Sequence, residues 1–141
     1  MRKDSANTNE LKLGVAGFGR IGKLTVWHHI ARKYFKEIVV NIGRASGTSL
    51  QDIAHYAERD STYGRLHAFL YGHAAKPVIS DLDEKAGTMM MDGTQVKFLR
   101  SDRLPHDIGW RRENVRLVVD TTGQFLDPTL TAEHPNGSAR G

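Results

Sequence analysis

Six residues near the N-terminus, Gly17-Phe18-Gly19-Arg20-Ile21-Gly22, have the spacing G-x-G-x-x-G. In this pattern the first glycine permits a tight turn, the second lets the backbone approach a pyrophosphate, and the third lets a helix pack closely on the preceding strand. The helix N-terminus would offer free N–H groups and a partial positive charge to phosphate oxygens, and Arg20 could add to that field. The motif therefore predicts a dinucleotide site; the alternative is a glycine-rich turn that binds nothing.

Cysteine is absent from the chain, which contains seven histidines. Its absence excludes disulfides, cysteine-ligated metal sites and a thiol nucleophile. Without a cysteine, none of the histidines has a partner for acyl transfer, so each is expected to be a packing or surface residue. We therefore predict no catalytic residue and no metal ligand in this chain.

Hydrophobic patterning places the glycine motif between a strand and a helix. Alternating apolar residues over 11–15 predict a short strand, and helical spacing predicts a helix over about 19–33. Residues 38–42 are nearly all apolar and predict a second, parallel strand covered on both faces. This order of strand, glycine turn, helix and strand is the context that the motif requires.

Later segments continue the alternation of strands and helices. Ser49 and Asp52 have the spacing of a helix-capping box, the segment 60–64 should end that helix, and 66–80 is ambiguous but could form strand pieces. Asp92-Gly93 between two apolar runs predicts a hairpin of 88–91 with 95–99, and 115–120 reads as a buried strand. The fold class is therefore α/β, with a Rossmann-type, doubly wound and mostly parallel sheet.

The residues after the second strand bear on the choice of cofactor. NAD sites usually carry Asp or Glu there, which bonds the adenosine ribose, whereas this chain has Gly43 and Arg44. An arginine without an acid tolerates a 2′-phosphate, so both NAD and NADP are candidates. The alternative is that Arg44 is a solvated loop residue.

The composition restricts the classes of protein. The chain has 141 residues, enough for one domain, and a net charge of +4 that is scattered along it. Because no basic run is interleaved with aromatic residues, nucleic acid is not indicated, and no apolar stretch approaches the ~20 residues of a membrane span. Residues 1–10 are polar and read as a flexible tail without a secretory signal, which favours the cytoplasm.

Five segments, in order along 11–126, resemble the phosphorylating glyceraldehyde-3-phosphate dehydrogenases. They are Gly17–Gly22 after a strand, Asp60-Ser61-Thr62-Tyr63-Gly64 (D-S-T-H-G in the family), the Asp92-Gly93 hairpin, Ile108-Gly109-Trp110 (I-P-W), and Val118–Phe125 (V-V-E-S-T-G-x-F). No single segment would suffice, but the ordered set is specific.

The resemblance implies a nicotinamide-dinucleotide site. Arg20 and Ile21 match residues beneath the pyrophosphate. The segment matching a loop at the adenine and nicotinamide-ribose region comprises Thr121, Thr122, Gly123 and Phe125. The family's adenine-holding arginine corresponds to Arg100 or Arg103. Ala16 replaces the family's Asn before the first glycine, and Gly43 replaces its acid.

The resemblance also implies what this chain lacks. In the family, the catalytic Cys lies in an S-C-T-T-N motif beyond the matching part. We therefore expect a dinucleotide-binding domain over 11–126, a truncated tail over 127–141, a sheet incomplete at its C-terminal end, no catalytic domain and no activity of the chain alone. The family is homotetrameric, and an uncovered sheet edge would favour self-association.

The activity implied by the resemblance is oxidation of an aldehyde to a thioester on Cys, hydride transfer to NAD(P), and release of an acyl phosphate. One alternative is a truncated or degenerate copy that binds no cofactor or pairs with an intact subunit. Another is a fragment of erythrose-4-phosphate dehydrogenase, because the half that would separate the two enzymes is absent.

Overall fold

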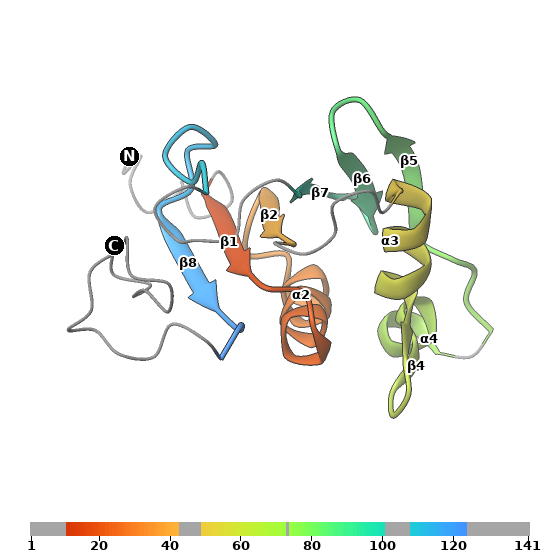
Figure 1. The fold of residues 1–141 in the computed structure, drawn as a ribbon. Helices are drawn as coiled ribbons and strands as arrows, with labels where there is room; N and C mark the ends of the chain where they lie inside the picture. Colours follow the sequence, from red (N-terminus) through yellow and green to blue (C-terminus); the bar gives the residue numbers. More distant parts are fainter. Residues whose placement is uncertain (1–10, 43–48, 73, 101–107, 124–141) are drawn as a thin grey trace, which may run out of the picture.

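A six-stranded sheet organises the part of the chain that the computed structural model describes, residues 11–42, 49–72, 74–100 and 108–123 (Figure 1). In spatial order its strands are β5 (Ile79–Asp83), β6 (Thr88–Met91), β7 (Thr94–Leu99), β2 (Glu37–Asn41), β1 (Lys12–Ala16) and β8 (Leu117–Asp120). A separate two-stranded hairpin is formed by β3 (Arg59–Asp60) and β4 (Gly64–Arg65).

Four neighbouring strands, β7, β2, β1 and β8, run parallel, whereas β5 and β6 join antiparallel at one side. The chain passes from β1 to β2 and β7 on one side of β1, and then places β8 on the other side. In open α/β sheets, ligands bind at the carboxyl ends of the strands where the order reverses in this way. The predicted Rossmann-type, mostly parallel α/β fold is confirmed, and its reversal point lies between β1 and β8.

Three helices cover one face of this sheet: α2 (Arg20–Arg32), α3 (Leu50–Glu58) and α4 (Leu66–Tyr71). Alternate residues of the strands point into the shared core with them, as the two-residue period of a strand requires. These strand residues are Leu13, Val15, Ile38, Val40, Met89, Met91, Val96 and Phe98. On the opposite face, Lys97 of β7 donates to Glu113 at 3.0 Å, which anchors the segment before β8.

Short-range sequence signals correctly predicted the start of α3 and the hairpin between β6 and β7. The Ser49 hydroxyl accepts a hydrogen bond from the Asp52 N–H at 3.1 Å, so the predicted cap of α3 is confirmed. Asp92 and Gly93 both have positive φ, +50° and +86°, as a tight hairpin turn between β6 and β7 requires.

The ambiguous stretch 66–80 contains a helix where strand pieces were considered. Residues 66–71 form α4, because Leu66 is fully buried and Leu70, one turn later, packs against the same core. Only the end of the stretch is extended, since β5 begins at Ile79. Six residues give too short a pattern to separate helical from strand periodicity.

Candidate cofactor site

The glycine turn has a backbone shape that excludes side chains at two positions. Gly17 has φ +96°, and its N–H donates to the Asn41 carbonyl at 3.0 Å, which ties the turn to the end of β2. A Cβ atom on Gly22 would overlap the Gly17 carbonyl oxygen. At Gly19, by contrast, a Cβ would meet nothing within 4 Å, so the turn is open on that side. This is the division of roles that the G-x-G-x-x-G pattern predicts.

The loop after β8 is locked against this turn. The Thr121 N–H donates to the Ala16 carbonyl at 2.9 Å, and its hydroxyl donates to the carbonyls of Ala16 and Gly17 at 2.9 and 3.2 Å. The Thr122 N–H and hydroxyl both donate to the Asp120 carboxylate, at 2.9 and 2.7 Å. The structure thus brings together two segments about a hundred residues apart in the sequence, both at carboxyl ends of strands.

Helix α2 begins directly at this turn without a side-chain cap. Gly19 is the N-cap residue, and the first turn contains no acidic residue. The Lys23 N–H bonds the Gly19 carbonyl at 2.9 Å and is the first to close a helical turn. Uncapped N–H groups and the helix dipole favour an anion at such an end, so the first turn suits a pyrophosphate.

Arg20 points away from the turn toward the β3–β4 hairpin. Its Nε donates to Asp60 at 3.2 Å, and a terminal nitrogen donates to the Thr62 hydroxyl at 2.5 Å. The Asp60 side chain is 1% exposed and also accepts the N–H groups of Thr62 and Tyr63, at 2.9 and 3.0 Å. The Tyr63 N–H, then Thr62 and Arg20, hold the pKa of Asp60 below its ordinary value, against the opposing effect of burial. Asp60 therefore fixes the guanidinium next to the first turn of α2.

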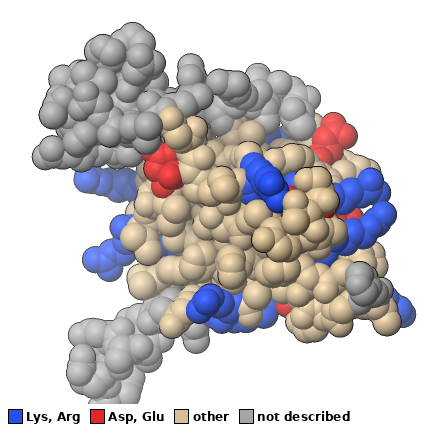
Figure 2. Space-filling model, turned by 90° about the horizontal axis from the view of Figure 1, so that it is seen from below, with Lys and Arg blue, Asp and Glu red and all other residues tan. Residues whose placement is uncertain are grey.

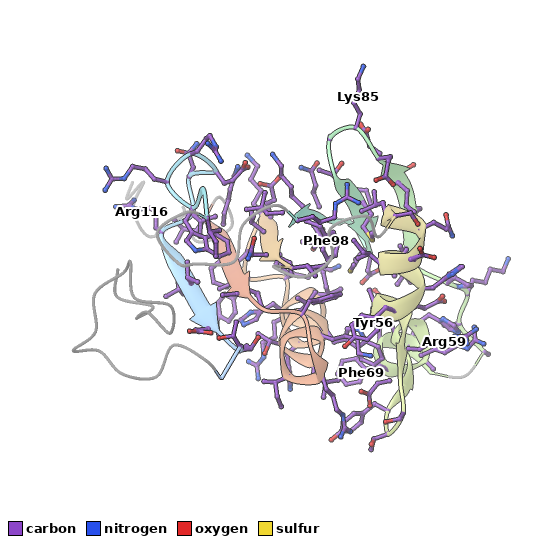
Figure 3. All side chains as sticks on the ribbon, in the orientation of Figure 1. Tyr56, Arg59, Phe69, Lys85, Phe98 and Arg116 are labelled. Atoms are coloured by element: carbon purple, nitrogen blue, oxygen red, sulfur yellow. The ribbon has the colours of Figure 1, made fainter. Side chains whose placement is uncertain are left out.

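Lys23 attaches the same helix to α3. Its side chain is buried, its ammonium donates to the Arg59 carbonyl, and it lies 4.1 Å from the centre of the Tyr56 ring. Burial lowers the pKa of Lys23. Phe18 packs edge-on against Tyr56 and Phe98, at 5.5 and 5.3 Å between ring centres. Figure 3 shows Tyr56 and Arg59 on the α3 side of this contact.

The far end of the site lies where β2 and β7 end. Ile42 is the first residue after β2, and its N–H donates to the Leu99 carbonyl at 2.7 Å. Arg100 follows β7 directly and pairs with Glu84 at 2.9 Å. Four of the predicted site residues lie outside the described residues: Gly43, Arg44, Arg103 and Phe125.

Sequence reasoning did not assign Asp60, Lys23 or Glu84 to this region. For Asp60 a signal existed, because it opens one of the five segments that resemble the family, but no spacing rule links it to Arg20, forty residues earlier. Within the described ranges, no group of three or more His, Cys, Asp or Glu could hold a metal ion. Of the helices in those ranges, none is long and apolar enough to cross a membrane.

Basic side chains do not gather into one patch on the face shown in Figure 2. Lys and Arg are dispersed there among uncharged residues. On this face the distribution agrees with the scattered charge of the sequence.

Replacing Asp60 by Asn should lower the free energy of unfolding of the domain at neutral pH. It should also make that free energy fall less steeply as the pH is lowered. The folded-state pKa of Asp60 lies below the ordinary 3.8, so its contribution is fully present above that value and is lost as the pH falls through the folded-state pKa. Urea unfolding at neutral and acidic pH measures both effects. Asp52→Asn, at an exposed position of α3, is the control. Equal acid dependence in Asp60→Asn and the unaltered chain would contradict this assignment.

Comparison with known proteins identifies the family of this chain. Residues 11–128 match the family described as glyceraldehyde 3-phosphate dehydrogenase, NAD binding domain. Similar proteins include glyceraldehyde-3-phosphate dehydrogenase 1 of Schizosaccharomyces pombe, 26% identical over 92% of this chain and 34% of that protein, and the cytosolic enzyme of Taxus baccata, 29% identical over 95% and 35%. The enzyme of Geobacillus stearothermophilus is 25% identical over 92% of this chain and 34% of its own length.

The chain thus spans about a third of the length of the curated relatives it matches. The match covers the glycine turn, the β3–β4 hairpin and the loop after β8, which form the candidate site described above. The chain belongs to the family of glyceraldehyde-3-phosphate dehydrogenase NAD-binding domains.

Proposed function

We propose that this chain binds a nicotinamide dinucleotide with its pyrophosphate on the first turn of α2, as the cofactor-binding part of an enzyme that oxidises and phosphorylates an aldehyde. The observation that carries the proposal is the tight turn. Gly22 can carry no side chain against the Gly17 carbonyl, while the space beside Gly19 is open. A turn that bound no ligand would not need free space beside its second glycine, where a pyrophosphate approaches the backbone.

The chain's own residues have separable tasks in this proposal. The N–H groups at the start of α2 would bind the pyrophosphate, and Thr121 would hold the turn in shape through its bonds to Ala16 and Gly17. Thr122 and Gly123, in the same loop, would line the cofactor. The cofactor, when bound, supplies the hydride acceptor. With no cysteine in the chain, none of its residues would form the acyl intermediate.

Titration calorimetry of the purified chain with NAD tests the proposal. We expect one site per chain and a higher melting temperature in NAD, because a ligand that binds only the folded state stabilises it. Binding of NAD but not of free nicotinamide would locate the affinity in the dinucleotide. An absence of both heat and thermal shift at millimolar NAD would favour the rival, a degenerate copy that binds no cofactor.

Two further properties are proposed from the relatives and the sheet edge. Relatives from Taxus baccata and Trypanosoma brucei brucei are named cytosolic, which supports a cytosolic location. Leu117 and Val118 of the outermost strand β8 are 54% and 38% exposed, which supports self-association of the chain.

A further inference from the structure

No acidic residue lies at Asn41 or Ile42, at the end of β2, where NAD-specific folds usually carry an Asp or Glu. Asn41 is level with Leu99 of β7, and Ile42 continues that ladder for one more hydrogen bond. The Ile42 side chain is half-buried and packs against the core. In dinucleotide folds an acid at this strand end accepts hydrogen bonds from the ribose hydroxyls, and its charge repels a 2′-phosphate. The Ile42 side chain can do neither, and in the sequence Gly43 replaces the family's acid.

A positively charged side chain, that of Arg100, lies at the same edge of the sheet, directly after β7. The parallel strands β2 and β7 end level with each other, at Asn41 and Leu99, so Arg100 and Ile42 are the next residues at the same edge of the sheet. Its guanidinium lies 2.9 Å from one Glu84 oxygen, and the Arg100 side chain is 23% exposed. A guanidinium carries five N–H donors in a fixed fork and binds phosphate oxygens in pairs.

The Arg100 guanidinium already binds an anion, the carboxylate of Glu84. One of its carboxylate oxygens pairs with Arg100, and the other accepts the Leu50 N–H at 2.8 Å. The Leu50 hydrogen bond, followed by Arg100, holds the pKa of Glu84 below its ordinary value, so the carboxylate is charged at neutral pH. Its side chain is 61% exposed, and exposed ion pairs contribute little to stability. A stronger anion could therefore displace it at small cost.

We infer that Arg100 is the cofactor-selecting residue of the site, and that it accepts the 2′-phosphate of NADP in place of the Glu84 carboxylate. This inference rests on the proposed dinucleotide site. The phosphate would gain charge-assisted hydrogen bonds from the guanidinium and meet no acid at the end of β2. Displacing Glu84 offsets part of this gain. The chain should consequently bind NADP about as tightly as NAD.

Calorimetry with NAD and NADP on the full chain and three variants tests the inference. Arg100→Gln should weaken NADP about tenfold and leave NAD within about twofold, because one charged hydrogen-bonding partner of the phosphate is lost. Glu84→Gln should strengthen NADP, since the competing charge is removed. Arg116→Gln is the matched control and should change neither affinity, because Arg116 directly precedes β8, which β2 and β1 separate from β7, and it lies away from Phe98 in Figure 3.

Phosphorus NMR of bound NADP measures the pKa of its 2′-phosphate. This pKa responds to direct contact with Arg100 and would not change if Arg100 only supported the fold. The pKa of the 2′-phosphate should fall on binding to the unaltered chain, and return toward its free value with Arg100→Gln. Arg100→Lys, which keeps the charge, should retain part of the fall.

The outcomes separate this inference from the proposed function. If NAD binds at least tenfold more tightly than NADP and Arg100→Gln alters both affinities equally or neither, Arg100 does not select the cofactor, although the dinucleotide site stands. If neither cofactor binds to the folded chain, the site itself is wrong and this inference falls with it.

Discussion

Gly22→Ala should abolish detectable NAD binding and destabilise the domain. The added Cβ would overlap the Gly17 carbonyl oxygen and lie 2.8 Å from the Thr121 hydroxyl oxygen. Neither neighbour can yield easily, because Gly17 and Thr121 are joined to Asn41 and Ala16 by backbone hydrogen bonds. Overpacking of this kind typically costs ~1–3 kcal/mol, and the turn would also lose the shape that fits a pyrophosphate. Thermal melting and calorimetry with NAD measure the two effects.

Gly19→Ala separates folding from binding. A Cβ at Gly19 meets nothing within 4 Å, and its φ of −76° suits any residue, so the melting temperature should change little. NAD affinity should still fall, because the methyl group would occupy the open side of the turn.

If Gly22→Ala melts like the unaltered chain and binds NAD equally well, the turn is not the pyrophosphate site.

The purified chain should form no NADH from glyceraldehyde 3-phosphate, phosphate and NAD. Oxidation through an acyl intermediate needs a thiolate, and the sequence contains no cysteine. Absorbance at the NADH band measures the rate, with a full-length relative such as the Geobacillus stearothermophilus enzyme as positive control. Turnover that heat destroys, at a rate above the protein-free control, would contradict the prediction and require another nucleophile.

Short-range patterns were sufficient for the elements that hold the site. Alternation predicted the strand before Gly17, and Asp92-Gly93 predicted the hairpin, because each feature depends on residues close together in the chain. The glycine spacing likewise predicted the shape of the turn, since steric exclusion at Gly22 is a local backbone property.

Contacts between distant segments could not be derived from spacing. The Arg20–Asp60 pair joins residues forty positions apart, and Arg100, directly after β7, pairs with Glu84 in the turn between β5 and β6. Both pairs depend on how α2, β7 and the hairpins assemble, which no local period encodes. The sequence therefore predicted Arg20 and Arg100 as cofactor contacts without their carboxylate partners, and those partners determine where each guanidinium lies.

The most direct test of the central claim is to map NAD binding residue by residue on the nitrogen-15-labelled chain by NMR. We predict that the largest amide shift changes on adding NAD fall on two segments, Gly17–Gly22 and Thr121–Gly123, which the structure locks together. Amides at the start of β1, at the opposite end of the strand, should barely move. Changes that instead centre on the start of β1, or that spare the glycine turn, would contradict the account.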